Sequence, residues 1–409
     1  MPCEKNDKQK LFFQKPPHTK QDPVYLTITK SRREETMQQI SLDTTYLYAN
    51  KANHYGITQE TIKNTKGHIQ KSIQTIDSNI AQNSYGFIST LNDQELENIT
   101  QNVFQQSSWA KFLVVIGIGG SDLGARALQQ ALSNNQNQTQ VIFHGDSTDP
   151  LAIQKLLNTI EFEKTIFNII SKSGETIETI SQYVFLKEYT KQHAHNWTKH
   201  FIFTTDKEKG ILREEAQKNN ILTTPIPANV GGRFSVLTPV GTLPAKFMGI
   251  NTQELIKGAQ SALDQQELLN IAKEIATTQY QLYTQNIKLA VMTPYSIQLE
   301  EFARWYRQLW AESLGKDQKG ILPIQARGPA DQHSQYQFYN QGSPLASYWH
   351  IQIDNRNTDY IIDNTDVQAG KYLISHSFHE IINIEQKASA LALNKNGRPV
   401  ATLHIPKLN

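Results

Sequence analysis

Short apolar runs alternate with helix-like stretches over residues 110–225. Four of the runs are strand candidates: 112–118, 140–144, 165–170 and 200–203. The first of them is typical of a strand buried on both faces of a sheet. The stretches between and after them have helical character: 122–134, 150–160, 177–192 and 209–218. This alternation predicts a parallel sheet that is covered by helices and connected by right-handed crossovers.

A second alternating unit is expected after a mostly helical stretch at about 242–286. Its expected strands are 288–292, 321–324 and 349–353, with one helix ending near Ser313 and a last helix over about 366–393. The pattern thus predicts an α/β fold with three parts: a polar arm (1–35), a helical lead-in with the first domain (36–250), and connecting helices with the second domain (251–409). The lead-in is expected to be helical over about 35–105.

The first strand runs directly into a glycine cluster. Gly117, Gly119 and Gly120 allow a tight turn with a close backbone approach, and Ser121 stands where a helix begins, a position that suits an anion. The spacing is not that of a dinucleotide fingerprint, because Asp122 occupies the place of the third glycine. A glycine turn that merely joins strand to helix is the alternative.

The third strand is followed by Ser-Lys-Ser-Gly-Glu-Thr at 171–176, which opens a helix. Three hydroxyls, freed N–H groups and the charge of Lys172 suit a phosphate. The order of a nucleotide P-loop is absent, so a phosphomonoester is favoured over ATP. A Ser/Thr-rich N-cap turn is the alternative.

Two further segments carry candidate chemistry. Gln308, Glu312 and Lys316 recur every four residues on one helix face, where Glu312 could act as a general base or simply form a solvated ion pair with the lysine. His333 lies in a polar turn and could transfer protons near neutral pH, although a histidine in a loop is more often structural. Two other histidine groups, 193–200 and 376–380, lack metal-ligand spacing and are expected at the surface.

Composition narrows the class of protein. Lys+Arg 40 against Asp+Glu 38 gives a net charge of +2, which favours neither nucleic acid nor a membrane as partner. Cys3 is the only cysteine, so no internal disulfide or cysteine-based zinc site is expected. With no signal-peptide core and no membrane-length apolar run, the cytoplasm is the expected location.

In combination, five motifs resemble the glucose-6-phosphate isomerase family, in a short bacterial-type form: Gly-Ile-Gly-Gly-Ser-Asp-Leu-Gly, Ser-Lys-Ser-Gly-x-Thr, Val-Gly-Gly-Arg-Phe-Ser, Glu-Ser-x-Gly-Lys and Asp-Gln-His-Ser. The resemblance covers roughly residues 80 to 409. It implies two sugar-isomerase (SIS) domains, each a mainly parallel sheet covered by helices, in a homodimer that needs no metal or redox cofactor.

The resemblance also implies roles for residues. Seven would bind the sugar phosphate: Gly120, Ser121, Ser171, Lys172, Ser173, Thr176 and Gln308. Glu312 would move the proton between C2 and C1, Arg233 would face the enediolate, and His333 would assist ring opening from the neighbouring subunit.

One departure qualifies this expectation. Family members generally continue into a C-terminal helix with Asp-Gln-x-Gly-Val-Glu and a substrate-contacting lysine, and no segment here matches it. Two functions are therefore expected: an isomerase of glucose 6-phosphate and fructose 6-phosphate, or a catalytically impaired regulator that binds sugar phosphates. A nicotinamide oxidoreductase is disfavoured by Asp122.

Overall fold

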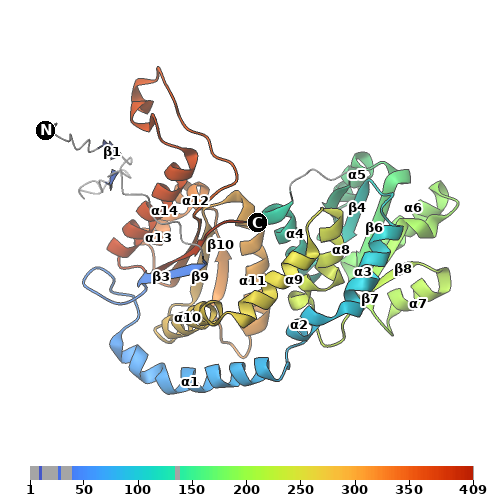
Figure 1. Ribbon diagram of the computed structural model, residues 1–409, viewed down its shortest axis with the longest axis horizontal. Coiled ribbons are helices and arrows are strands. Elements are labelled where there is room, and N and C mark those ends of the chain that lie inside the picture. Colours follow the sequence, from blue (N-terminus) through green and yellow to red (C-terminus); the bar gives the residue numbers. More distant parts are fainter. Residues whose placement is uncertain (1–8, 12–25, 29–38, 134–138, 409) are drawn as a thin grey trace. The chain divides into compact units, whose positions relative to one another are not determined.

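The computed structural model describes residues 9–11, 26–28, 39–133 and 139–408 (Figure 1). The chain forms two compact units: a larger one (57–292 and 297–326) and a smaller one (residues up to 56, 293–296 and 327–409). The predicted domain limits, 36–250 and 251–409, stay a prediction. Most of the predicted arm lies outside the described residues, apart from the antiparallel pair β1 (Gln9–Leu11) and β2 (Leu26–Ile28).

The larger unit contains an all-parallel sheet in the order β5-β4-β6-β7-β8. Its strands are β4 (Phe112–Ile116), β5 (Gln140–Phe143), β6 (Thr165–Ile170), β7 (Phe201–Asp206) and β8 (Leu222–Ile226). The first four confirm the predicted alternation. The last was missed because Leu-Thr-Thr-Pro-Ile has few apolar residues, and its proline is tolerated on an edge strand.

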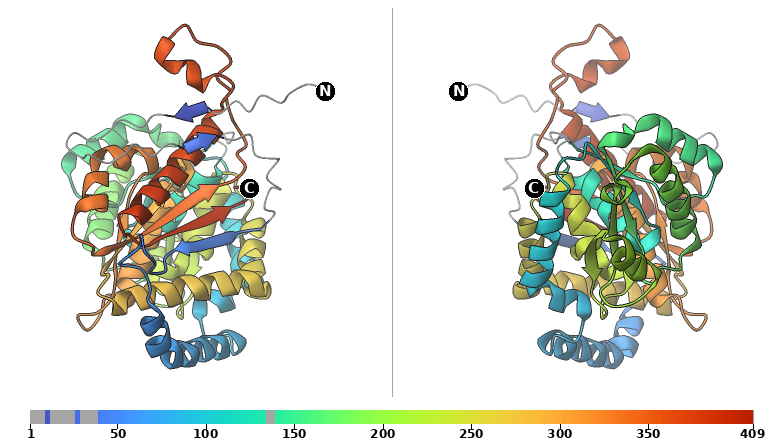
Figure 2. Two further views of the ribbon diagram at one scale, coloured as in Figure 1. Left: turned by 90° about the vertical axis from the view of Figure 1, so that its left-hand side faces the viewer. Right: turned by 90° about the vertical axis from the view of Figure 1, so that its right-hand side faces the viewer.

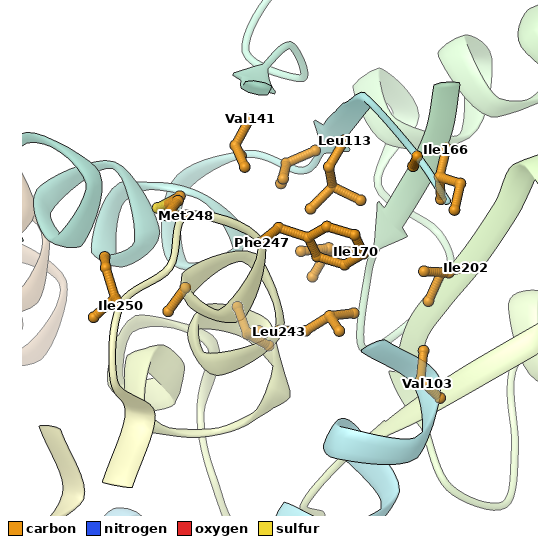
Figure 3. Packing of buried hydrophobic residues seen from close by; sticks show 14 of the residues in the cluster. Val103, Leu113, Val141, Ile166, Ile170, Ile202, Leu243, Phe247, Met248 and Ile250 are labelled. Atoms are coloured by element: carbon orange, nitrogen blue, oxygen red, sulfur yellow. The ribbon is translucent and has the colours of Figure 1, made fainter. Parts of the chain in front are cut away.

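Helices cover both faces of this sheet (Figures 1 and 2). Leu113 and Val115 face a core shared with α3 (Gln94–Gln106), α4 (Leu123–Leu132) and α8 (Pro239–Phe247), shown in Figure 3. Val114 and Ile116 face the opposite core, shared with α5 (Pro150–Thr159), α6 (Ile177–His193) and α7 (Ile211–Asn219). Because successive strand residues alternate between faces, one unbroken apolar run supplies both cores.

The rest of the larger unit is mostly helical. It contains the helices α1 (Gln59–Ala81), α2 (Gly86–Ser89), α9 (Thr252–Asp264), α10 (Gln266–Thr284) and α11 (Glu300–Leu314). It also contains β10 (Leu322–Gln325), which pairs in parallel with β9 (Leu289–Pro294); the last two residues of β9 belong to the smaller unit. The helical stretch predicted at 242–286 is divided. Gly249 has a left-handed φ of 72° and Asn251 caps α9, so one helix ends and another begins there.

The smaller unit contains β11 (Ala346–Ile353) parallel to β12 (Val400–Ile405), with β3 (Ser41–Tyr46) antiparallel on the other side of β12. Its helices are α12 (Gly328–Ser334), α13 (Tyr336–Gln341) and α14 (Phe378–Lys395).

Two sequence predictions are wrong in this unit. The stretch from residue 35 was expected to be helical, but Ser41–Tyr46 pairs as an edge strand whose exposure alternates over its last four residues. The last helix starts at Phe378 rather than near 366, because Ser375 has a φ of 68° and the capping box of Ser377 and Glu380 sets the helix start.

Candidate functional site

The candidate site lies at the point in the sheet of the larger unit where the strand order reverses. β4 pairs with β5 on one side and with β6 on the other, so the segments after β4 and β6 leave neighbouring strand ends. Ligands of open parallel sheets bind at such a switch point, beyond the carboxyl ends of the strands. We call residues 117–121 the glycine loop and residues 171–176 the serine–lysine loop.

The glycine loop is packed tightly against another part of the protein. A Cβ atom on Gly120 would lie 2.3 Å from the carbonyl carbon of Gly232, the first residue of the 3₁₀ helix η5 (Gly232–Leu237). Ser235 Oγ donates to the carbonyl oxygens of Gly120 and Gly232 at 3.2 and 2.6 Å. The close approach expected in this loop is therefore made, at Gly120, to the protein's own backbone. A contact of Gly120 or Ser121 with substrate stays a prediction.

One face of α11 brings three polar residues to this edge of the sheet. Gln308 Nε2 lies 2.8 Å from where a Cβ of Gly119 would stand, and it donates to Glu312 Oε2 at 3.2 Å. One turn earlier, Arg304 Nη2 lies 3.9 Å from Asp146 Oδ2, in the segment after β5. Spacing by four residues predicted the shared face of Gln308 and Glu312, and it could also have pointed to Arg304.

Arg233 is the charged partner of Glu312. Its Nη1 donates to Glu312 Oε1 at 3.0 Å, its Nε donates to Ser313 Oγ at 2.8 Å, and its guanidinium lies 4.6 Å from the Phe234 ring centroid. Lys316, the partner in the surface ion-pair alternative, donates instead to the carbonyl oxygen of Ser313 at 3.2 Å. The Glu312 side chain is 51% exposed, so its two oxygens are held in place while the carboxylate stays accessible.

The serine–lysine loop exposes its second serine and leaves its threonine half-buried. Ser171 is buried at the end of β6 and accepts from the Gly174 N–H at 3.0 Å, which shapes the turn. Ser173 is exposed and Thr176 is half-buried, and Thr176 is the N-cap residue of α6 without a capping side-chain bond. N–H groups in the first turn of a helix have no partner within the helix and are able to bind an anion. This geometry suits a phosphate group.

Lys172 has protein partners in this structure. Its Nζ donates to the carbonyl oxygens of Ala228 and Val230 at 2.8 and 2.9 Å. These carbonyls lie in the connection between β8 and η5. The position of Lys172 in the motif gave no signal for this bridge, because its acceptors are more than fifty residues away in the sequence.

A buried charge pair lies directly after the glycine loop. Asp122, at 2% side-chain exposure, accepts from Arg126 Nε at 2.6 Å, and Arg126 Nη2 is 3.3 Å from Asp146. Burial raises the pKa of the Asp122 carboxyl, while Arg126 opposes that shift. The residue that breaks the dinucleotide fingerprint thus anchors the first turn of α4.

His333 belongs to the smaller unit. It lies exposed in the last turn of the short helix α12, where a polar turn was expected. The neighbouring Gln332 donates to the Tyr295 hydroxyl at 2.6 Å, and Asp331 accepts from the Arg327 N–H at 2.6 Å. Burial raises the pKa of Glu385, while the nearby His333 lowers it. The helix is therefore fixed locally, and the participation of His333 in the site stays a prediction.

The expectation of surface histidines is wrong for His200. It is fully buried, with Nδ1 2.8 Å from the Thr165 carbonyl oxygen and its ring stacked on Phe162 at 5.0 Å. Burial lowers its pKa, so the neutral ring is favoured. Within the described part of the chain, no three His, Cys, Asp or Glu side chains gather where they could hold a metal ion. No helix in that part is long and apolar enough to cross a membrane.

A parallel sheet with an anion-suited loop and an Arg–Glu pair at its carboxyl edge defines an α/β protein with a candidate site for an anionic substrate. The sequence model described as phosphoglucose isomerase matches residues 104–386. The chain belongs to the phosphoglucose isomerase family.

Named relatives agree with this family, and solved structures match the fold. The chain is 38% identical to the glucose-6-phosphate isomerase of Carboxydothermus hydrogenoformans over 342 residues, which covers 78% of this chain and 74% of the relative. It is 34% identical to that of Rubrobacter xylanophilus over 319 residues, which covers 74% of each. The crystal structure of a hypothetical protein from Thermus thermophilus matches with a TM-score of 0.79 at 28% identity, covering 91% of this chain and 89% of that one.

A glucose-6-phosphate isomerase from Chlamydia trachomatis matches with a TM-score of 0.64 at 21% identity, covering 79% of this chain and 66% of that one. At this level of identity the match supports the α/β fold. Together with the sheet described above, it confirms the predicted fold class.

Proposed function

We propose that this chain interconverts glucose 6-phosphate and fructose 6-phosphate. The observation that carries the proposal is the Arg233–Glu312 pair, 3.0 Å apart, in the unit that also holds the serine–lysine loop. A protein that only binds sugar phosphates needs the loop alone, so the pair favours the enzyme over the regulator. The family and the names of the relatives agree with this choice.

The pair suits the chemistry of aldose–ketose exchange. A base must move a proton between neighbouring carbons, and an electrophile must stabilise the negative charge that develops on oxygen. Glu312 is held through one oxygen by Arg233 and through the other by Gln308, and it is half-exposed. Arg233 has five N–H donors, and among the described residues Ser313 and Glu312 each accept from one of them. The remaining donors can serve a developing oxyanion.

The serine–lysine loop supplies binding away from the reacting carbons. In the proposal, Ser173, Thr176 and the first N–H groups of α6 hold the phosphate, with Ser171 shaping the turn and Ser121 and Gly120 beside it. Binding energy from a non-reacting group can fix the orientation of the reacting carbons. In the same proposal His333 opens the sugar ring, and no metal or redox cofactor takes part.

The activity is tested by a coupled assay in both directions, with mannose 6-phosphate as a third substrate. We expect interconversion by the wild-type chain and a kcat lower by about 10²- to 10⁴-fold for Glu312→Gln, which still binds fructose 6-phosphate in a calorimetric titration. If the wild-type chain binds sugar phosphates and interconverts none of them, it is the regulator instead.

We further propose a homodimer in which His333 completes the neighbouring site. The supporting observations are that Glu312 and His333 lie in different compact units and that the resemblance divides their roles between subunits. A cytoplasmic location, which the single cysteine favours, belongs to the same proposal.

Glu312→Ala and His333→Ala chains, unfolded together and refolded, test the shared site. A mixed dimer then has one site with both lesions and one with neither, so we expect activity to return. If mass spectrometry shows mixed dimers that stay inactive while refolded wild type is active, the shared site is refuted.

A further inference from the structure

The ammonium group of Lys172 joins two segments of the larger unit. Its Nζ lies 2.8 Å from the carbonyl oxygen of Ala228 and 2.9 Å from that of Val230. A lysine ammonium has three N–H donors and no acceptor, and its bonds to neutral acceptors are charge-assisted. Two of the three donors are therefore used within the protein.

The segment held by Lys172 leads directly to Arg233. The N–H of Val230 donates to the Pro227 carbonyl oxygen at 3.1 Å, and Val230 is buried. Two residues later, Gly232 packs against Gly120 so closely that a Cβ on Gly120 would clash. The connection is thus held at one end by the lysine and at the other by the glycine loop, and Arg233 follows at once.

We propose that Lys172 is a positioning residue, which ties the serine–lysine loop to the backbone that presents Arg233 to Glu312. The inference rests on the proposed function, and it replaces the role of phosphate ligand that the resemblance implies for this side chain. In this arrangement the hydrogen bonds of Lys172 fix the serine–lysine loop, which holds the phosphate, relative to the backbone that carries Arg233. Lys172 acts on the reaction through Arg233.

The two roles predict different kinetics for Lys172→Met, which keeps an unbranched side chain and removes the charge and the donors. Loss of a phosphate ligand raises KM and weakens the binding of inorganic phosphate. Loss of the hydrogen bonds from Lys172 to the carbonyl groups of Ala228 and Val230 lets Arg233 move. This movement lowers kcat by about tenfold to a hundredfold, because small misplacements of reacting groups are costly. We expect the second result, with KM and the dissociation constant of inorganic phosphate changed by less than about threefold.

A double-mutant cycle shows whether the effect passes through Arg233. In an Arg233→Met background, Lys172→Met should lower kcat further by less than about threefold, since the residue it positions is gone. If the two residues have independent roles, the fold losses in kcat of the two single variants should instead multiply in the double variant.

Lys207→Met is the matched control. Lys207 stands just after β7, at the same edge of the sheet, and pairs with Glu95 at 3.3 Å with both side chains largely exposed. We expect its kcat, KM and phosphate binding to match the wild type. If Lys172→Met does not fold, Lys172→Gln takes its place, because the amide keeps two N–H donors; circular dichroism and the thermal midpoint decide which variant is used.

The outcomes separate the inference from the proposed function. If the wild type is inactive, the proposed function is refuted, and the titration with inorganic phosphate still tests the role of Lys172. Unchanged phosphate binding by Lys172→Met supports the positioning role, and lost phosphate binding overturns it. With an active wild type, a rise in KM at constant kcat, or losses that multiply in the cycle, overturns the inference.

Discussion

The glycine loop and the serine–lysine loop leave adjacent strands, yet they use their backbone and polar groups in different ways. The glycine loop is packed against protein: Gly119 against Gln308 and Gly120 against Gly232. The serine–lysine loop has an exposed Ser173 and a half-buried Thr176, at a helix start without a side-chain cap. A glycine cluster at a strand end thus need not mean direct contact with a ligand.

This difference indicates that the two loops have different functions at the switch point. The glycine loop brings η5 and α11 together and so sets the geometry of Arg233, Gln308 and Glu312. The other loop offers donors for an anion. Substitutions in the glycine loop and its contacts should therefore alter kcat or stability, and substitutions in the serine–lysine loop should alter KM. Four predictions test this division.

The largest effect is expected for Glu312→Gln. The amide keeps the shape of the side chain but cannot accept a proton from carbon, so kcat should fall by about 10²- to 10⁴-fold, the usual contribution of general base catalysis. Exchange of the C2 proton with solvent, followed by NMR in deuterated water, should stop as well. Retained exchange would remove Glu312 from the role of base.

Gly120→Ala tests whether the glycine loop is a packing element. The added Cβ would lie 2.3 Å from the carbonyl carbon of Gly232, where only backbone can give way, so we expect a loss of about 1–3 kcal/mol in urea unfolding together with a lower kcat. Gly232→Ala is the control, because a Cβ there meets no other atom within 4 Å. Equal stability of the two variants would contradict the packing role.

The double variant Ser173→Ala/Thr176→Ala tests the opposite side. We expect KM for fructose 6-phosphate to rise by about tenfold, equivalent to about 1.4 kcal/mol of lost hydrogen bonding, with kcat and the thermal midpoint nearly unchanged. A fall in kcat at constant KM would break the division between the loops.

The smallest effect concerns Asp122 and pH. Because burial raises the folded-state pKa of this carboxyl above its ordinary 3.8, the folded chain keeps the proton to a higher pH than the unfolded chain does. Between the two pKa values, the unfolding free energy therefore falls as pH rises, by up to about 1.4 kcal/mol per pH unit. The measurement is the unfolding free energy of wild type minus that of Asp122→Asn at each pH. We expect this difference to decrease as pH rises between the two pKa values. An increase with pH would show that Arg126 outweighs burial.

The sequence by itself determined the local features of this protein. The unbroken apolar run at β4 predicted a strand buried on both faces, and the loops after β4 and β6 followed from glycine, serine and lysine at a strand-to-helix change. Spacing by four placed Gln308 and Glu312 on one face of α11. Each of these properties depends on neighbours within a few residues, which is why sequence alone can predict them. The motifs in combination also identified the family.

Tertiary structure alone decided which distant groups meet. Glu312 and Arg233 are 79 residues apart in the sequence, and Lys172 reaches carbonyl groups 56 and 58 residues away. His200, expected at the surface, is buried because β6 and its flanking rings enclose it, and Ser41–Tyr46 becomes a strand because β12 offers it a free edge. Such pairings depend on strand order and packing between elements, and no local pattern encodes those.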